Sequence, residues 1–286
     1  TMADTTRISV KKFDPSKLVQ KHFVAIMTAK RGSGKSYLTK DILYRLHCEG
    51  FPRCCIFSGT EGANKFFSDF IPEVFVHSPL DLNTLTHIWN TQKEIILKQR
   101  CGHLDENEDT RILIVLDDCS FDKKTFTSQV IREMLCNGRH YKLTLIITLQ
   151  YLLDLPPAMR SNVDFGFFFR DNIKTNRERL YRQFAGFYPD YRTFEAVFEA
   201  CTANYECMCV DNTVSSTDHT DIVSYYKAEA VDFKFGPPSL WKFHDKLFIS
   251  EEDEYILRQK MTLQSASKNS MTKVSGNSSI TVVHEA

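Results

Sequence analysis

Ala29-Lys30-Arg31-Gly32-Ser33-Gly34-Lys35-Ser36 (AKRGSGKS, residues 29–36) is the stretch that decides the fold of this chain. It follows a short apolar run at residues 22–28 and precedes residues 35–46, whose apolar side chains recur at helical spacing. A glycine-rich turn between a strand and a helix lets backbone N–H groups converge, and the helix N-terminus adds partial positive charge. The pattern is typical of a phosphate-binding P-loop.

Each part of this loop has an expected role. Gly32 and Gly34 supply backbone freedom, Lys35 the charge for the β- and γ-phosphates, and Ser36 a hydroxyl ligand for Mg²⁺. Ala29 stands where the usual pattern has its first glycine, which puts loop geometry in question more than nucleotide binding. The expected nucleotide-binding residues are Lys30, Arg31, Gly32, Ser33, Gly34, Lys35, Ser36 and Tyr37.

An apolar run at residues 112–116 ends in two carboxylates, Asp117 and Asp118. Ligands of open α/β sheets lie at the carboxyl ends of strands, so both acids are expected beside the P-loop. Asp117 is the candidate Mg²⁺ ligand, together with Ser36, and Asp118 the candidate general base that polarises water. On its own, such a pair would more simply begin a turn.

Polar residues beside the next strand extend the candidate site. Gln150 follows the apolar run 143–149 and could sense the γ-phosphate or orient water, or else be a solvated strand end. Arg139 precedes that run and is a candidate for reaching the γ-phosphate held by a neighbouring subunit. Arg160 and Arg170 compete with Arg139 for that role, and for each arginine an ordinary surface position is the simpler interpretation.

Strands alternate with helices along the chain, which predicts an α/β fold with a mainly parallel central sheet flanked by helices. The expected strands are residues 22–28, 54–57, 111–116, 143–149 and 164–169. The expected helices are residues 35–46, 81–99 and 123–137. Residues 205–210 and 222–228 are expected to form a C-terminal antiparallel strand pair added to this core.

Three segments are expected along the chain. Residues 1–20 are polar and predict an N-terminal surface segment, and residues 21–260 a single P-loop domain. Residues 261–286 are rich in Ser, Thr, Asn and Lys, which predicts a disordered polar tail.

The composition limits the choice of partners and compartment. The 36 basic and 36 acidic residues balance, so nucleic-acid contact requires a local patch or several subunits. No apolar stretch reaches the roughly 20 residues of a membrane helix. Nine cysteines, an odd number, favour a reducing compartment. Cys201, Cys207 and Cys209 with His219 fit no common zinc spacing, and buried thiols are the preferred interpretation.

The order of motifs resembles a known family. AKRGSGKS, ILIVLDD, NGRHYKLTLIITLQ and LPPAMRSNVDFGFFFR follow one another as in the genome-packaging ATPases of nucleocytoplasmic large DNA viruses. These are poxvirus-type members of the FtsK–HerA superfamily of P-loop ATPases. The resemblance covers about residues 8–185, and the missing first glycine at Ala29 is its main departure.

The resemblance implies an ATPase that uses ATP and Mg²⁺ to drive double-stranded DNA into a capsid. It implies a homo-oligomeric ring of about five or six subunits, a capsid or procapsid portal as partner, no membrane insertion, and a place in the viral factory of the host cytoplasm or in the virion. Carried over by motif, the catalytic residues are Lys35, Asp118, Gln150 and Arg139, with Arg139 acting in trans.

Two other functions stay open at this point. A P-loop kinase acting on a small molecule such as a nucleoside would share the loop, but usually carries an arginine-rich lid that is not evident here. A non-catalytic assembly protein could keep ATP as a structural ligand. The intact Lys35, Asp117 and Asp118 argue against that second alternative.

Overall fold

The computed structural model describes residues 8–119, 125, 127–152, 157–250 and 253–262. The chain divides into two compact units, residues 1–241 and 242–286, so the division comes earlier than the expected domain end at residue 260. In the second unit, residues 253–262 are helical. The remainder of the expected polar tail, residues 263–286, lies outside the described residues.

One sheet organises the first unit, and its order in the described chain is β1-β9-β8-β7-β2-β6-β5-β3-β4. Its strands are β1 Lys11–Lys12, β2 Val24–Thr28, β3 Cys54–Ser58, β4 Val76–His77, β5 Ile112–Asp117, β6 Leu143–Leu149, β7 Phe165–Phe169, β8 Cys207–Asp211 and β9 Val223–Tyr226. All pairs from β7 through β2 to β4 are parallel. Because β8 runs antiparallel to both β7 and β9, the predicted fold class, including the antiparallel pair, is confirmed.

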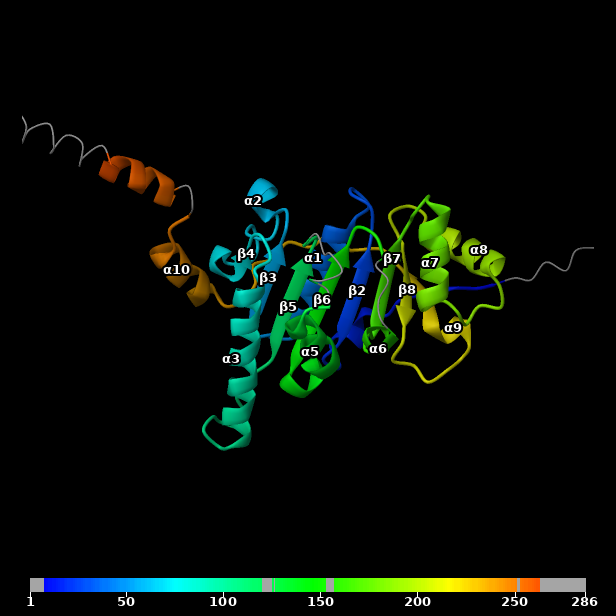
Figure 1. Ribbon diagram of the computed structural model, residues 1–286, viewed down its shortest axis with the longest axis horizontal. Coiled ribbons are helices and arrows are strands. Elements are labelled where there is room, and N and C mark those ends of the chain that lie inside the picture. The colour runs from blue at the N-terminus through cyan, green and yellow to red at the C-terminus, as the bar shows by residue number, and fades with distance from the viewer. Residues whose placement is uncertain (1–7, 120–124, 126, 153–156, 251–252, 263–286) are drawn as a thin grey trace, which may run out of the picture. The chain divides into compact units, whose positions relative to one another are not determined.

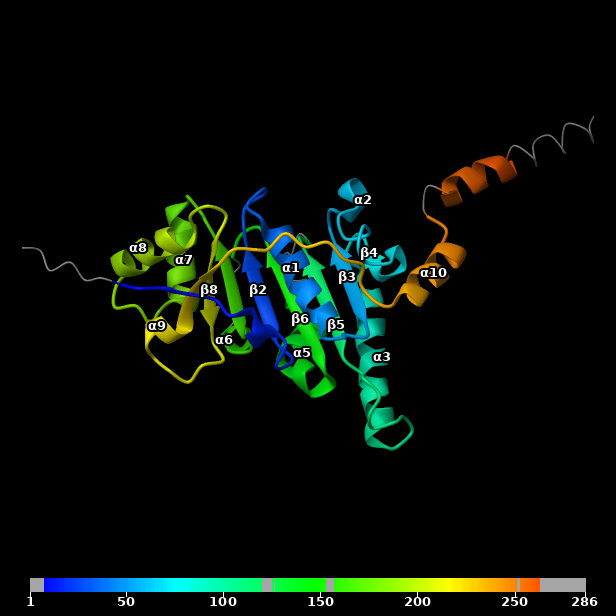
Figure 2. The same ribbon diagram turned by 180° about the vertical axis from the view of Figure 1, so that it is seen from behind.

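Helices cover both faces of this sheet (Figures 1 and 2). The helices are α1 Lys35–Cys48, α2 Glu61–Asn64, α3 Leu82–Arg100, α5 Gln129–Asn137, α6 Pro157–Arg160, α7 Lys174–Phe184, α8 Tyr191–Cys201, α9 His219–Ile222 and α10 Pro238–Leu247, with 3₁₀ turns at Pro15–Leu18, Glu73–Phe75 and Gly138–Tyr141. Helix α1 packs on one face, and α3, α5, α7 and α8 pack on the other. Most of the predicted helix at 123–137 is found in α5; residues 120–124 and 126 lie outside the described residues.

The central strands are apolar on both sides because both sheet faces are covered. In β2, Val24 and Ile26 join the core beneath α3, α5, α7 and α8, whereas Ala25 and Met27 join the core beneath α1. A strand buried on both faces needs a continuous apolar run rather than alternation. This is why residues 112–116 and 143–149 could be identified from sequence.

The N-terminal segment differs from the expected surface position. Phe13 exposes only 3% of its surface, and its ring makes edge contacts with Phe165, Phe167 and Tyr226. Its backbone N–H donates to Tyr225 O over 2.8 Å, next to the parallel pairing of β1 with β9. Residues 8–18 therefore extend the sheet, because a single Phe among charged neighbours buries itself without producing any periodic pattern.

Candidate functional site

The carboxyl ends of β2, β3, β5 and β6 meet at one edge of the sheet and form a cleft of ≈ 710 Å³. Its lining comprises Lys30, Arg31, Gly32, Gly34, Lys35, Ser36, Tyr37, Gly59, Thr60, Ala63, Asn64, Phe66, Asp117, Asp118, Gln150 and Tyr205. The cleft thus brings together the P-loop, both acids and Gln150. Parallel strands direct their carboxyl ends to the same edge, which is why residues distant in sequence gather here.

The P-loop has the backbone geometry that phosphate binding requires. Gly32 and Gly34 adopt left-handed conformations, with φ of 77° and 99°, and Gly34 caps the N-terminus of α1. Ala29 keeps a negative φ and donates its N–H to Leu149 O over 3.1 Å, so the missing first glycine does not break the loop. Backbone N–H groups at such a turn and helix start favour anions.

The two acids lie in different surroundings. Asp117 exposes 3% of its surface, and its carboxylate accepts hydrogen bonds from Thr148 Oγ1 at 2.6 Å and Ser58 Oγ at 3.3 Å. Burial raises the pKa of Asp117 above its ordinary value, while the Thr148 bond and the Lys35 charge oppose that shift. Asp118 leaves the strand with φ 48°, and its N–H donates to Thr148 Oγ1 over 3.1 Å.

Asp118 is the meeting point of three elements. Lys35 Nζ, from the start of α1, lies 4.0 Å from Asp118 Oδ1. Gln150 Nε2, just past the end of β6, donates to Asp118 Oδ2 over 2.7 Å. The residues that the sequence singled out for phosphate binding, general base and sensor are therefore in contact, although their catalytic roles stay predictions.

Three residues that support the acids were missed at the sequence level. Ser58 and Thr148 fix the carboxylate of Asp117. Gly59 donates its N–H to Asp117 O over 3.0 Å, and a Cβ at Gly59 would lie 2.3 Å from Asp118 O. The available signal was a hydroxyl at the end of each apolar strand; the close approach at Gly59 had none, since it joins distant parts of the chain.

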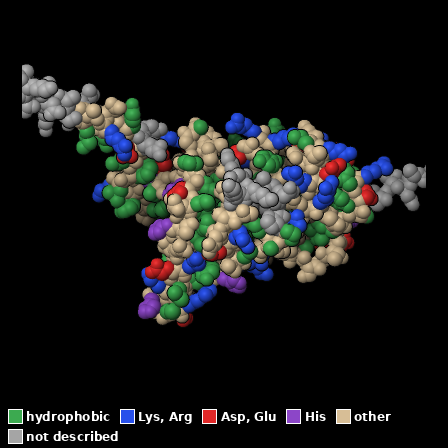
Figure 3. Space-filling model, viewed as in Figure 1, with side chains coloured by type: hydrophobic (Ala, Val, Ile, Leu, Met, Phe, Trp, Pro, Cys, Tyr) green, Lys and Arg blue, Asp and Glu red, His purple; other side chains and the backbone are tan. Residues whose placement is uncertain are grey.

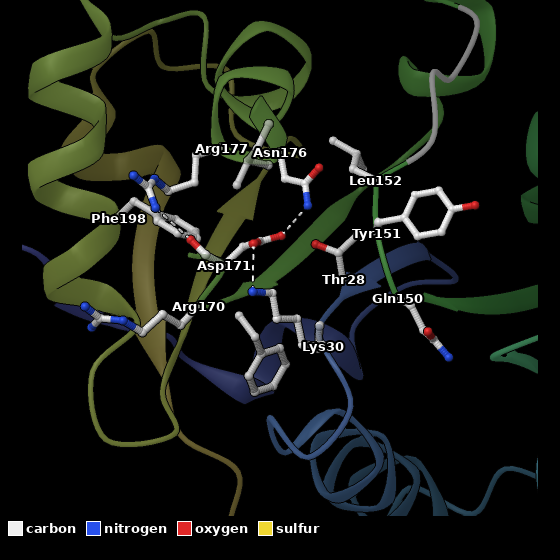
Figure 4. A pocket seen from close by; sticks show the side chains of 13 residues that line it. Thr28, Lys30, Gln150, Tyr151, Leu152, Arg170, Asp171, Asn176, Arg177 and Phe198 are labelled. Carbon is white, nitrogen blue, oxygen red and sulfur yellow. Dashed lines mark hydrogen bonds and ion pairs between the residues drawn. The ribbon is translucent and has the colours of Figure 1, made fainter. Parts of the chain in front are cut away.

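Lys30 lies on the other side of the loop and already has protein partners (Figure 4). Its Nζ is 3.4 Å from Asp171 Oδ1, and Asn176 Nδ2 donates to Asp171 Oδ2 over 2.8 Å. The pocket they line has a volume of ≈ 20 Å³, about that of one water molecule. In Figure 4 the amide of Gln150 is directed away from Asp171. This small pocket therefore braces the P-loop against the start of α7.

The candidate arginines lie at opposite edges of the sheet. Arg139 and Arg160 precede β6 and β7, at the edge away from the cleft, whereas Arg170 follows β7 at the cleft edge. Arg139 forms an ion pair with Asp164, whose other oxygen accepts the N–H of Val24 over 2.8 Å. The structure therefore does not bring Arg139 to the cleft of its own chain, and only a role in trans stays open for it as a prediction.

The basic stretch along α7 is largely paired within the protein. Lys174 and Arg182 each approach Glu178, and Arg177 pairs with Glu195 over 2.7 Å. Figure 3 shows basic and acidic side chains interspersed on the visible face. Both observations favour an ordinary solvated helix face for α7 over a basic stripe for DNA.

Two further observations concern metals and membranes. No group of three or more His, Cys, Asp or Glu side chains in the described part of the chain is placed to hold a metal ion. Cys207 and Cys209 are buried in β8, where burial raises the pKa of the Cys209 thiol. Among the described helices, none combines the length and apolarity that crossing a membrane requires.

Comparison with known proteins identifies the family. A profile of the Poxvirus A32 protein family matches residues 10–229 of this chain. The chain belongs to the poxvirus A32 protein family. Protein L437 of Acanthamoeba polyphaga mimivirus is 34% identical over 247 residues, which cover 86% of each chain. Protein 075L of invertebrate iridescent virus 6 is 32% identical, over 82% of this A32-family chain and 93% of its own.

Solved structures show that the A32-family chain shares its fold with P-loop NTPases. The genome packaging NTPase B204 of Sulfolobus turreted icosahedral virus 2, in complex with AMPPCP, aligns with a TM-score of 0.52 and 16% identity. The alignment covers 76% of this chain and all of B204. At that identity the likeness concerns the fold alone, and it agrees with the sheet order and P-loop position described above.

Proposed function

We propose that this chain is an ATPase that moves double-stranded DNA and packages a viral genome into a capsid. The observation that carries the proposal is the contact of Lys35, Asp118 and Gln150 in one cleft beside the P-loop. A phosphate-binding cation, a carboxylate and an amide that positions water are the groups that hydrolysis of a phosphoanhydride uses.

The phosphate end of ATP would lie over the left-handed glycines at the start of α1. Lys35 would neutralise the β- and γ-phosphates. Ser36 and Asp117 would hold Mg²⁺, and the carboxylate fixed by Ser58 and Thr148 fits an ion that takes one or two carboxylates and keeps several waters. Bound there, Mg²⁺ would neutralise charge that develops on the phosphate oxygens.

Asp118 would accept the proton of the attacking water. Without nucleotide it faces Lys35 on one oxygen and Gln150 on the other. A bound γ-phosphate offers Lys35 a more highly charged partner, which frees one Asp118 oxygen for water. Gln150, which both donates and accepts, would hold that water in line.

The DNA and packaging parts of the proposal rest on the family and on the named neighbour. The chain belongs to the poxvirus A32 protein family, and B204, which has the same fold, is a viral genome packaging NTPase. The chain is electrically neutral overall, so we infer that weak DNA contacts are summed over the subunits of a ring rather than made by one strongly basic face.

The test is ATP turnover, measured as inorganic phosphate release with and without linear double-stranded DNA. DNA should raise the rate, and Asp118→Asn should lower kcat by about 100-fold or more, the usual effect of losing a general base. A rate that DNA does not change would refute the DNA-translocase assignment. Phosphate transfer to an added nucleoside, in place of release, would instead indicate a small-molecule kinase.

Asp245→Asn is the matched control for this substitution. Asp245 has a highly exposed side chain and is not part of the cleft lining. Its variant should turn over ATP at the native rate with and without DNA. Equal losses in Asp118→Asn and Asp245→Asn would mean that the assay reports a general charge effect, and the role given to Asp118 would be wrong.

A further inference from the structure

The cleft has an aromatic lining beside its phosphate loop. Tyr37 and Phe66 lie in edge contact, with ring centroids 6.2 Å apart. Tyr205 lines the same cleft but exposes 71% of its surface, more than any other large hydrophobic residue in the described chain. An exposed aromatic ring in a concave site is a candidate ligand contact.

A turn of unusual conformation presents Tyr205. Glu206 N donates to Ala203 O over 2.9 Å, which closes a four-residue turn. Both central residues have positive φ, 53° at Asn204 and 63° at Tyr205. That combination is typical of type I′ turns, which favour Asn followed by Gly. Asn204 fits its place, whereas Tyr205 occupies the position where glycine has the lower conformational cost.

The turn is anchored on both sides and lies next to the P-loop. Before it, Thr202 Oγ1 donates to Phe198 O over 2.7 Å at the end of α8. After it, β8 pairs with β7 through Cys207 and Phe169. Phe169 also packs under the P-loop, since its Cε1 would be 3.5 Å from a Cβ at Gly34. The same strand end therefore supports both the turn and the phosphate loop.

We propose that Tyr205 stacks on the base of the bound nucleotide. The inference rests on the proposed function, because it takes a nucleoside triphosphate as the ligand. The P-loop groups recognise phosphates only, and a flat base requires a flat partner such as a tyrosine ring. Backbone strain is commonly kept at functional sites, and here it holds an exposed ring in the cleft. Since every base has a π-face, Tyr205 adds affinity for ATP and GTP alike.

Tyr205→Gly separates this role from a structural one. Glycine suits the left-handed position, so the melting temperature should stay the same or rise. The dissociation constant for ATP, measured by calorimetry, should increase roughly 5- to 100-fold, the range for loss of one stacked aromatic ring. Inorganic tripolyphosphate, which has no base, should bind the native chain and Tyr205→Gly equally. Tyr205→Phe keeps the ring and should bind ATP like the native chain.

Tyr255→Ala is the matched control, since Tyr255 is also exposed and lies outside the cleft lining. It should bind ATP like the native chain. Native affinity for ATP in Tyr205→Gly would overturn the inference while leaving the proposed function intact. Equal losses of ATP and tripolyphosphate would overturn it too, because the turn would then shape the phosphate site. A native chain that binds no ATP would refute both proposals.

Discussion

At the scale of single residues, one hydroxyl organises the acid pair. Thr148 Oγ1 donates to the buried carboxylate of Asp117 and accepts the N–H of Asp118. The sequence identified the two acids because they end an apolar strand, and their positions in the cleft agree with that. It did not identify Thr148, since a threonine inside a strand is ordinary and its partners lie on another strand.

Thr148→Val keeps the side-chain shape and removes both hydrogen bonds. We expect the free energy of unfolding, measured by urea denaturation, to fall by about 1–3 kcal/mol, because buried polar groups lose their partner. Thr144→Val in the same strand is the control: Thr144 is fully buried and its hydroxyl has no hydrogen-bond partner in the described chain. Thr144→Val should be neutral or stabilising, and a larger loss there than in Thr148→Val would contradict the assignment.

Asp117 gives a prediction for pH. Because burial raises its pKa in the folded chain, the folded state favours the neutral carboxyl relative to the unfolded state. The stability that Asp117 contributes is therefore present below its unfolded pKa and is lost as pH rises through its folded pKa.

In buffer without nucleotide or Mg²⁺, Asp117→Asn should therefore raise the melting temperature at pH 7, and the gain should shrink as pH falls toward 4. The same variant should lose Mg²⁺-dependent ATP turnover. Thermal unfolding between pH 3 and 8 checks the first part. A melting temperature at pH 7 below that of the native chain would show that the ionised carboxylate stabilises the fold.

At the scale of elements, predictability followed pattern strength. The strands at residues 112–117 and 143–149 and the helix α1 were evident because continuous apolar runs and helical spacing are strong signals. Phe13 and the pairing of β1 with β9 were missed, because two-residue strands carry no period. The division after Trp241 was missed as well, since compactness depends on contacts that composition does not encode.

The junction between β3 and β5 supplies a test at this scale. In Gly59→Ala the new methyl would lie 2.3 Å from the backbone oxygen of Asp118, so one of the two strand ends must move. We expect kcat to fall by about tenfold or more, because small displacements of catalytic groups are costly. Gly186→Ala is the control, as a Cβ there meets no atom within 4 Å. Native turnover in Gly59→Ala would show that the position of Asp118 is not critical.

At the scale of the whole molecule, the arrangement of arginines concerns assembly. Arg139 has a side chain that is 55% exposed, and it lies at the edge of the sheet opposite its own cleft. If it stabilises transition-state charge, it must do so in the cleft of a neighbouring subunit. Sequence alone could suggest this through the family resemblance, but could not show that Asp164 holds the guanidinium.

Mixing two inactive variants tests that arrangement. Arg139→Ala and Asp118→Asn should each hydrolyse ATP poorly, and their mixture should regain part of the native rate, because some interfaces then combine an intact arginine with an intact acid. Arg160→Ala and Arg170→Ala serve as the competing arms. No rescue at any mixing ratio would count against Arg139, and rescue confined to one competing arm would transfer the role to that arginine.

The most direct measurement of the central claim is displacement of a third strand from a DNA triplex, because only movement along the duplex removes that strand. At concentrations where sedimentation shows an assembled ring, the native chain should displace the strand with ATP. It should not do so with a non-hydrolysable analogue, nor should Lys35→Ala with ATP. DNA-stimulated ATP hydrolysis by the assembled ring without any displacement would contradict the account of this chain as a DNA translocase.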